Sequence, residues 1–140
     1  MNSNFNPLSA KELINRINKI PRVHLAQLPT VLEYAPNISK ELNINLYIKR
    51  DDCTALAFGG NKTRHLEFIM AKTLKGDYDC ILTGAASQSN FCRQAVAAAN
   101  KLNLDSYLVL MHGIKGKLMQ GNFLLYNILG ANVDVVEGEN

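Results

Sequence analysis

Strand-like and helix-like segments alternate from residue 44 to residue 136, and this alternation constrains the fold more than any other feature of the sequence. The strand-like runs are 44–49, 80–83, 107–111 and 133–136, and the helix-like runs are 63–75, 89–103 and 120–129. Such alternation is typical of βαβ units, which build a parallel sheet. Because the strands are short and largely apolar, they suit a sheet buried on both sides. The sequence therefore predicts an α/β fold with an open parallel sheet and helices on both faces.

Residues 1–43 precede this region and are predicted to form an irregular lead-in with one short helix. Ser9 is a candidate N-cap, because Glu12 follows three residues later as in a capping box. Pro21 would end the helix. We therefore expect two parts, a lead-in over 1–43 and an α/β domain over 44–140.

The composition excludes several classes of protein. The chain has 140 residues, of which 47% are hydrophobic and 19% charged, so it can bury a core. Its net charge is +3 and its lysines and arginines are scattered, which argues against a nucleic-acid partner. The sequence has no apolar run near the ~20 residues of a membrane span, so no membrane partner is expected. The three cysteines and three histidines lack metal-ligand spacing, and the odd cysteine number fits a reduced cytoplasmic protein.

Two loops would lie at the carboxyl edge of the predicted sheet, where open parallel sheets bind their ligands. One loop, 57–63, follows the first predicted strand and contains Lys62. The other, 84–90, follows the second predicted strand and ends in Ser89 and Asn90. If these two strands are neighbours, Lys62 and the Ser89–Asn90 pair come near the same crevice.

Lys62 is the candidate nucleophile of the first loop. It lies in the first turn of a predicted helix, where the helix dipole disfavours a cation and so favours the neutral amine that attacks a carbonyl. Gly59 and Gly60 would let the backbone approach a ligand closely. A solvated lysine after a flexible glycine turn fits the same spacing. A nucleotide phosphate loop is excluded, because Asn61 and Leu56 occupy the places of its two essential glycines.

The second loop offers hydroxyls, side-chain amides and backbone N–H groups at a predicted helix start. This arrangement suits a carboxylate or a phosphate. N-capping by Ser87 or Ser89 uses the same geometry, so both interpretations stay open.

Several blocks of residues together resemble one family of enzymes. They are Leu28-Pro29-Thr30, Ile48-Lys49-Arg50-Asp51-Asp52, Leu56-Ala57-Phe58-Gly59-Gly60-Asn61-Lys62-Thr63-Arg64, Leu66-Glu67-Phe68, Gln88-Ser89-Asn90, Arg93-Gln94, Gln120-Gly121-Asn122 and Leu129-Gly130-Ala131. The chain resembles the D-cysteine desulfhydrase and 1-aminocyclopropane-1-carboxylate deaminase family from about residue 20 to residue 136. The block around Lys62 is the most specific.

The resemblance implies a fold type II, tryptophan-synthase-like lyase or deaminase that depends on pyridoxal 5′-phosphate and acts on a small amino acid. Lys62 would carry the cofactor as a Schiff base, and Asn90 would bond its ring 3-hydroxyl. Ser89, together with Gln88, would hold the substrate carboxylate, and Ser89 is also a candidate for proton handling. With D-cysteine, β-elimination would release sulfide, pyruvate and ammonia.

The chain departs from the family pattern at three points. His65 stands where the family usually has a lysine directed at the cofactor phosphate, so His65 is the candidate phosphate contact. Phe91 replaces a histidine or glutamine. Family members are more than twice this length, and the complete enzyme would be a homodimer. The chain would thus comprise two parts: a lead-in, which belongs to the large domain in the family, and the small domain. The C-terminal portion of the large domain would be absent. The alternative hypothesis is a truncated, inactive α/β binding domain.

Overall fold

A three-stranded parallel sheet lies at the centre of the chain. The computed structural model describes residues 7–112 and 118–137. The strands β3 (Cys80–Ala86), β4 (Asp105–Met111) and β5 (Asn132–Val136) follow one another in the order β3-β4-β5. Both pairs are parallel, and Thr83 lies opposite Leu108, which lies opposite Val133. The predicted α/β class and parallel sheet are confirmed.

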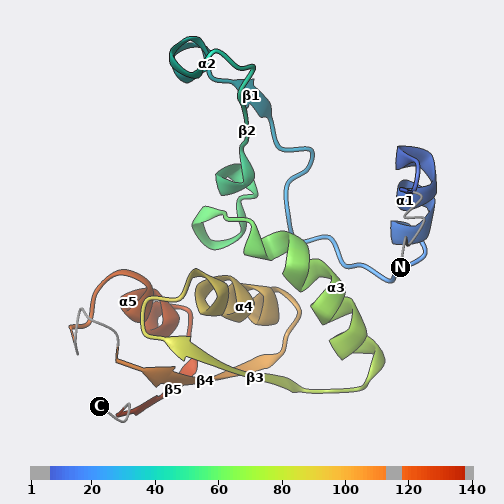
Figure 1. The fold of residues 1–140 in the computed structure, drawn as a ribbon. Coiled ribbons are helices and arrows are strands. Elements are labelled where there is room, and N and C mark those ends of the chain that lie inside the picture. The colour runs from blue at the N-terminus through green and yellow to red at the C-terminus, as the bar shows by residue number, and fades with distance from the viewer. Residues whose placement is uncertain (1–6, 113–117, 138–140) are drawn as a thin grey trace, which may run out of the picture.

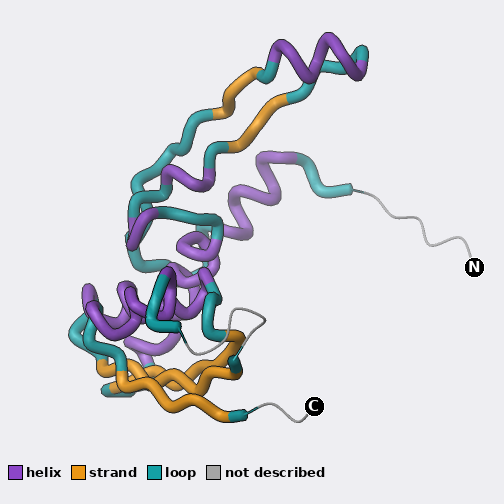
Figure 2. The backbone as a smooth tube through the Cα atoms, turned by 90° about the vertical axis from the view of Figure 1, so that its left-hand side faces the viewer, coloured by secondary structure: helices purple, strands orange, loops and turns teal. Residues whose placement is uncertain are grey.

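Helices α4 (Asn90–Lys101) and α5 (Gly121–Ile128) lie on one face of this sheet, and α3 (Lys62–Lys75) packs against α4 (Figures 1 and 2). On one side, the buried side chains of α4 pack against Leu66 and Met70 of α3. On the other side, they pack against Leu108 and Leu110 of β4. The alanines of α4 allow this close approach, because several of them are fully buried between the two layers.

No helix of the described residues covers the opposite face of the sheet, which corrects the prediction of helices on both faces. Along β4, Ser106, Leu108 and Leu110 are buried, whereas Tyr107, Val109 and Met111 are exposed. The strands are apolar on both faces, as the sequence indicates, but the described helices cover one of them. The uncovered face therefore presents apolar side chains to solvent.

Residues 44–49 do not form the first strand of the parallel sheet, so that prediction is wrong. The strand β2 (Tyr47–Lys49) pairs antiparallel with β1 (Leu32–Tyr34) in a separate two-stranded sheet. Together with α2 (Pro36–Leu42), these strands form an arm that extends from the body of the molecule (Figures 1 and 2). Side chains alternate between the two faces in parallel and antiparallel strands alike, so the period of two located the strand without revealing its partner. The pair joins residues on both sides of the predicted boundary at 43/44, and the domain assignment stays a prediction.

The lead-in contains α1 (Ala10–Ile17), and its predicted capping box is present. Ser9 Oγ accepts from the N–H of Glu12, and the Glu12 carboxylate accepts from the N–H of Ser9. No residue of α1 is buried. The residues after it are tied to α3 by the buried Glu67 carboxylate, which accepts from the N–H groups of Leu25 and Ala26. In the described part of the chain, every helix is too short or too polar to span a membrane.

Candidate active site

A strained loop leads into the helix that begins with Lys62. Two short 3-10 turns, Asp51–Cys53 and Leu56–Phe58, precede α3. Positive φ angles occur at Ala55, Ala57, Phe58, Gly59 and Gly60. Such angles are uncommon for residues other than glycine, and strained backbone clusters at ligand sites. Lys62 follows directly, is exposed, and has no hydrogen-bond or ion-pair partner among the described residues. Its amine is therefore available to a ligand.

Packing within the protein requires Gly59 and Gly60, and their close approach to a ligand stays a prediction. A Cβ on Gly59 would stand 1.8 Å from the carbonyl oxygen of Asp52. A Cβ on Gly60 would stand 2.2 Å from Nε2 of Gln94. Both glycines also have positive φ, 73° and 135°. The loop thus packs closely against its own supporting residues.

Two buried threonines and Gln94 hold this loop from beneath. Thr54 Oγ1 donates to the carbonyl of Gly60 at 2.8 Å and accepts from its N–H at 2.9 Å. Thr63 Oγ1 donates to Oε1 of Gln94 at 2.7 Å, and both side chains are fully buried. Because these bonds lie on both sides of Lys62, they fix the backbone that carries it.

The second predicted loop ends at the start of α4, where Ser89 is the N-cap. Ser89 Oγ accepts from the N–H of Cys92 at 3.3 Å, so the capping interpretation is confirmed for Ser89. The Tyr126 hydroxyl donates to the carbonyl of Ser89 at 2.8 Å. Burial raises the pKa of this tyrosine, which keeps the phenol protonated as a donor. The backbone at Ser89 is therefore held from α5.

Gln88 is occupied by contacts with the start of α5. Its Nε2 donates to the carbonyl of Gln120 at 3.0 Å, and its Oε1 accepts from the N–H of Asn122 at 2.9 Å. Gly121 lies between them with a φ of 55°, and a Cβ there would stand 2.6 Å from Oε1 of Gln88. Both polar atoms of Gln88 are thus engaged within the protein. Its predicted role toward the substrate carboxylate stays a prediction.

The two predicted loops lie together, but neighbouring strands are not what brings them together. β2 and β3 belong to different sheets and are not neighbours. Instead, the carbonyl of Gly59 accepts from Nη2 of Arg93 and from Nε2 of Gln94, both at 2.9 Å. These bonds place the loop before Lys62 against the first turns of α4, which begins at Asn90. His65, the candidate phosphate contact, is exposed in the first turn of α3 and has no bonded partner among the described residues.

Three side chains without a predicted role support the two loops. Arg93 and Gln94 bond the first loop, and Asn122 bonds the second. They belong to the blocks Arg93-Gln94 and Gln120-Gly121-Asn122. The usable signal was the position of each block just inside a predicted helix start. Their partners lie 29 to 35 residues away, so the contacts themselves required the fold.

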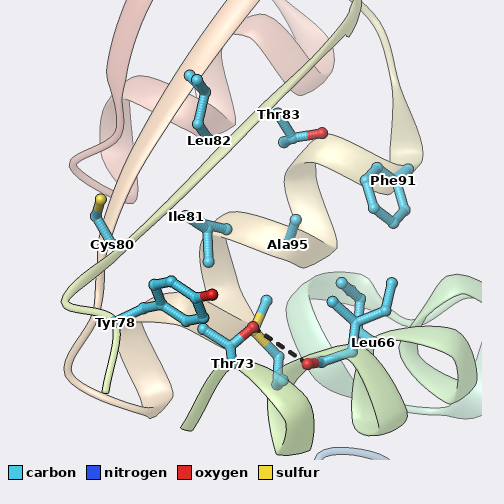
Figure 3. A pocket seen from close by; sticks show the side chains of 11 residues that line it. Leu66, Thr73, Tyr78, Cys80, Ile81, Leu82, Thr83, Phe91 and Ala95 are labelled. Atoms are coloured by element: carbon cyan, nitrogen blue, oxygen red, sulfur yellow. Dashed lines mark hydrogen bonds between the residues drawn. The ribbon is translucent and has the colours of Figure 1, made fainter. Parts of the chain in front are cut away.

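A groove of about 330 Å³ lies between α3 and β3 and is distinct from the predicted site. Figure 3 shows Ile81 directed toward Ala95 of α4, while Leu82 lies on the opposite side of β3. The lining is largely apolar, and Thr73 donates within its own helix to the carbonyl of Ile69. None of the predicted site residues lines this groove.

The model of the pyridoxal-phosphate dependent enzyme family matches residues 23–140. The chain belongs to this family. Two D-cysteine desulfhydrases, from Salmonella paratyphi C (strain RKS4594) and Klebsiella pneumoniae (strain 342), are each 39% identical over 128 residues. The match covers 89% of this chain and 39% of each relative. This member of the family therefore spans about two-fifths of the length of the curated relatives it matches.

Solved structures agree with the family assignment. The crystal structure of a homologue of 1-aminocyclopropane-1-carboxylate (ACC) deaminase is 38% identical, with a TM-score of 0.85, over 95% of this chain and 40% of that chain. Threonine deaminase isoform 2 from Solanum lycopersicum is 21% identical with a TM-score of 0.67, over 93% of this chain and 36% of that one. The second match shows a shared fold alone. The predicted family and its fold type are confirmed.

Proposed function

We propose that this chain supplies the lysine-bearing part of the active site in a pyridoxal-phosphate dependent lyase or deaminase of a small amino acid. The observation that carries the proposal is the double hydrogen bond to the carbonyl of Gly59. It holds the loop before Lys62 against the start of α4, where Ser89 and Asn90 lie.

The groups at this junction fit the cofactor. Lys62 offers an amine without a bonded partner among the described residues, and this amine would attach the cofactor covalently. Asn90 offers a side-chain amide for the ring oxygen, and His65, in the same turn as Lys62, would contact the phosphate. When bound, pyridoxal phosphate would serve as the electron sink for bond breaking at the substrate.

Ser89 and Lys62 would act on the substrate. The Ser89 oxygen accepts from the N–H of Cys92, so its own hydroxyl proton is available to donate to a carboxylate. The start of α4 also favours an anion, because unpaired N–H groups and the helix dipole point toward it. The Lys62 amine, once released, would move a proton at the substrate carbons. The relatives named as D-cysteine desulfhydrases make D-cysteine the first substrate to test.

The complete enzyme would be a cytoplasmic homodimer. Three free cysteines fit a reducing compartment. The open apolar face of the sheet, with Tyr107, Val109 and Met111, fits a chain that packs against further protein surface.

A second candidate is a binding domain that keeps the fold without turnover. The open apolar face of the sheet favours this candidate, because such a face can bind another protein. This candidate predicts that D-cysteine is not consumed even by a form that includes the rest of the large domain.

Visible absorbance tests the proposal on residues 1–140. Addition of pyridoxal phosphate should give a yellow species that sodium borohydride bleaches. Lys62→Ala should abolish this species, whereas Lys72→Ala, a substitution in the last turns of the same helix, should leave it intact. An equal signal from the wild-type chain and Lys62→Ala would contradict the proposal.

A further inference from the structure

Two neighbours hold the side-chain amide of Asn90, and both donate a hydrogen bond to its oxygen. Its Oδ1 accepts from Nη1 of Arg93 at 3.1 Å and from Nδ2 of Asn122 at 3.0 Å. Its Nδ2 has no partner among the described residues, and Asn90 is exposed. The oxygen therefore faces the protein and the N–H groups face outward.

The orientation of the Asn122 side-chain amide follows from two neighbours, one of which can only accept a hydrogen bond and one of which can only donate. Its Nδ2 lies 2.7 Å from the carbonyl of Gln88, which can only accept. Its Oδ1 lies 2.9 Å from Nη1 of Arg93, which can only donate. Exchanging the two ends of this amide would place donor against donor and acceptor against acceptor. The assignment of oxygen and nitrogen in Asn122 is thus fixed by chemistry.

Asn122 and Arg93 set the orientation of the Asn90 side-chain amide. Both groups that face it, Nδ2 of Asn122 and Nη1 of Arg93, are donors, so the atom between them must be the acceptor Oδ1. Arg93 is itself positioned by the bond from Nη2 to the carbonyl of Gly59. One guanidinium therefore connects the loop before Lys62, the start of α4 and the start of α5.

We infer that Arg93 and Asn122 are positioning residues that turn the N–H groups of Asn90 outward, so that the site binds an oxygen acceptor there and selects the deprotonated ring oxygen of the cofactor. The second half of this inference rests on the proposed function. Neither Arg93 nor Asn122 needs to touch the cofactor, because each acts through the Asn90 amide. A hydrogen-bond donor at a ring oxygen favours its charged form and so lowers its pKa.

Nuclear magnetic resonance of ¹⁵N-labelled residues 1–140 tests the orientation without cofactor. The Nδ2 protons of Asn122 should exchange with water roughly tenfold more slowly than those of Asn90, as expected for one ordinary hydrogen bond. Asn45, an exposed asparagine without a side-chain bond among the described residues, is the reference for free exchange. Slow exchange at Asn90 with free exchange at Asn122 would overturn the inference.

The same spectra test whether Arg93 and Asn122 do the positioning. The side-chain amide of Asn90 should be ordered in the wild-type chain and should fall below an order parameter of about 0.6 in Arg93→Met and in Asn122→Ala. Arg93→Lys should restore little of the order, since one ammonium cannot replace the two guanidinium nitrogens that reach Gly59 and Asn90. Arg16→Met, on the exposed α1, is the matched control. An Asn90 amide that stays ordered in both site variants would overturn the inference.

Cofactor absorbance tests the second half. The pH midpoint at which the visible band of the bound cofactor titrates should rise by roughly one unit in Arg93→Met and Asn122→Ala, which is a tenfold change in that equilibrium. An unchanged midpoint, with the band still dependent on Lys62, would overturn the selection of the deprotonated oxygen. If the wild-type chain shows no visible band that depends on Lys62, the proposed function is contradicted instead. The spectra without cofactor still decide the orientation of Asn90.

Discussion

Thr63 and Gln94 form a fully buried hydrogen bond of 2.7 Å that joins the first turn of α3 to the first turns of α4. Thr63 is the residue after Lys62, and the other end of the Gln94 amide donates to the carbonyl of Gly59. One side chain thus contacts the backbone loop before the lysine and the helix turn after it. The position of Lys62 depends on this bridge.

Gln94→Leu should destabilise the chain by roughly 1–3 kcal/mol, because it removes one buried hydrogen-bond partner from the Thr63 hydroxyl and one from the Gly59 carbonyl. Urea unfolding followed by circular dichroism measures this change. Gln27→Leu is the matched control, since the Gln27 side chain is exposed and makes no bond among the described residues. Equal stability of the two variants would contradict the bridging role.

Gly59→Ala should destabilise the chain more than Gly130→Ala does. Both residues have φ near +75°, so both substitutions carry a backbone strain of about 1–3 kcal/mol. At Gly59 the new Cβ would also meet the Asp52 carbonyl at 1.8 Å, whereas at Gly130 nothing lies within 4 Å. Thermal unfolding of the two variants separates the clash from the strain. If Gly59→Ala costs no more than Gly130→Ala, the packed loop described here is wrong.

The stability of the chain should fall as the pH drops below about 4.5, and Glu67 should contribute to this loss. Burial alone would raise the pKa of Glu67, but the N–H groups of Ala26 and Leu25 and the Arg22 guanidinium outweigh it and lower the pKa below its ordinary value of 4.5. A lowered pKa in the folded state means stabilisation that is present above the ordinary value and is lost as the pH falls through the folded one.

The test for Glu67 compares unfolding between pH 3 and pH 7, a range of about four units around the ordinary carboxyl pKa. Glu67→Gln should be less stable at neutral pH by roughly 1–3 kcal/mol and should lose part of the acid dependence. Glu41→Gln, on the exposed α2, is the control. If Glu67→Gln keeps the full loss of stability at low pH, other carboxylates and not Glu67 are responsible for that loss.

Residues 1–140 alone should be a poor catalyst. In the proposed site, Lys62, Ser89, Asn90 and His65 would contact the cofactor from one side, whereas a preorganised site draws its support from several elements. We expect pyruvate release from D-cysteine, with pyridoxal phosphate added, to stay close to the reaction of the cofactor without protein. Turnover well above that reaction, removed by Lys62→Ala, would show that this part of the site suffices.

The helices and parallel strands could be predicted because their signals are local. The capping box of Ser9 and Glu12, the helix that begins at Lys62 and the alanine-rich α4 each depend on residues close in sequence. The strand at Tyr47–Lys49 was located correctly but given the wrong partner, since its pairing with Leu32–Tyr34 depends on the turn through α2. The open sheet face could not be predicted, because apolar residues look the same whether or not a layer covers them.

The positions of the candidate site residues at helix starts could be predicted, whereas the contacts that support them could not. Lys62 and Ser89–Asn90 stand at helix starts, which the sequence shows, and the resemblance gave them roles. The support from Arg93, Gln94 and Asn122 depends on contacts between segments about 30 residues apart. Side chains of this kind have no local signature, so only the fold reveals which backbone groups they hold.

The central claim is that Lys62 is the residue that carries pyridoxal phosphate. The direct measurement is peptide mass spectrometry of residues 1–140 after incubation with pyridoxal phosphate and reduction with sodium borohydride. We expect a pyridoxyl adduct on the peptide that contains Lys62, with little on other lysines. An adduct found mainly on Lys49 or Lys72, with Lys62 unmodified, would contradict it.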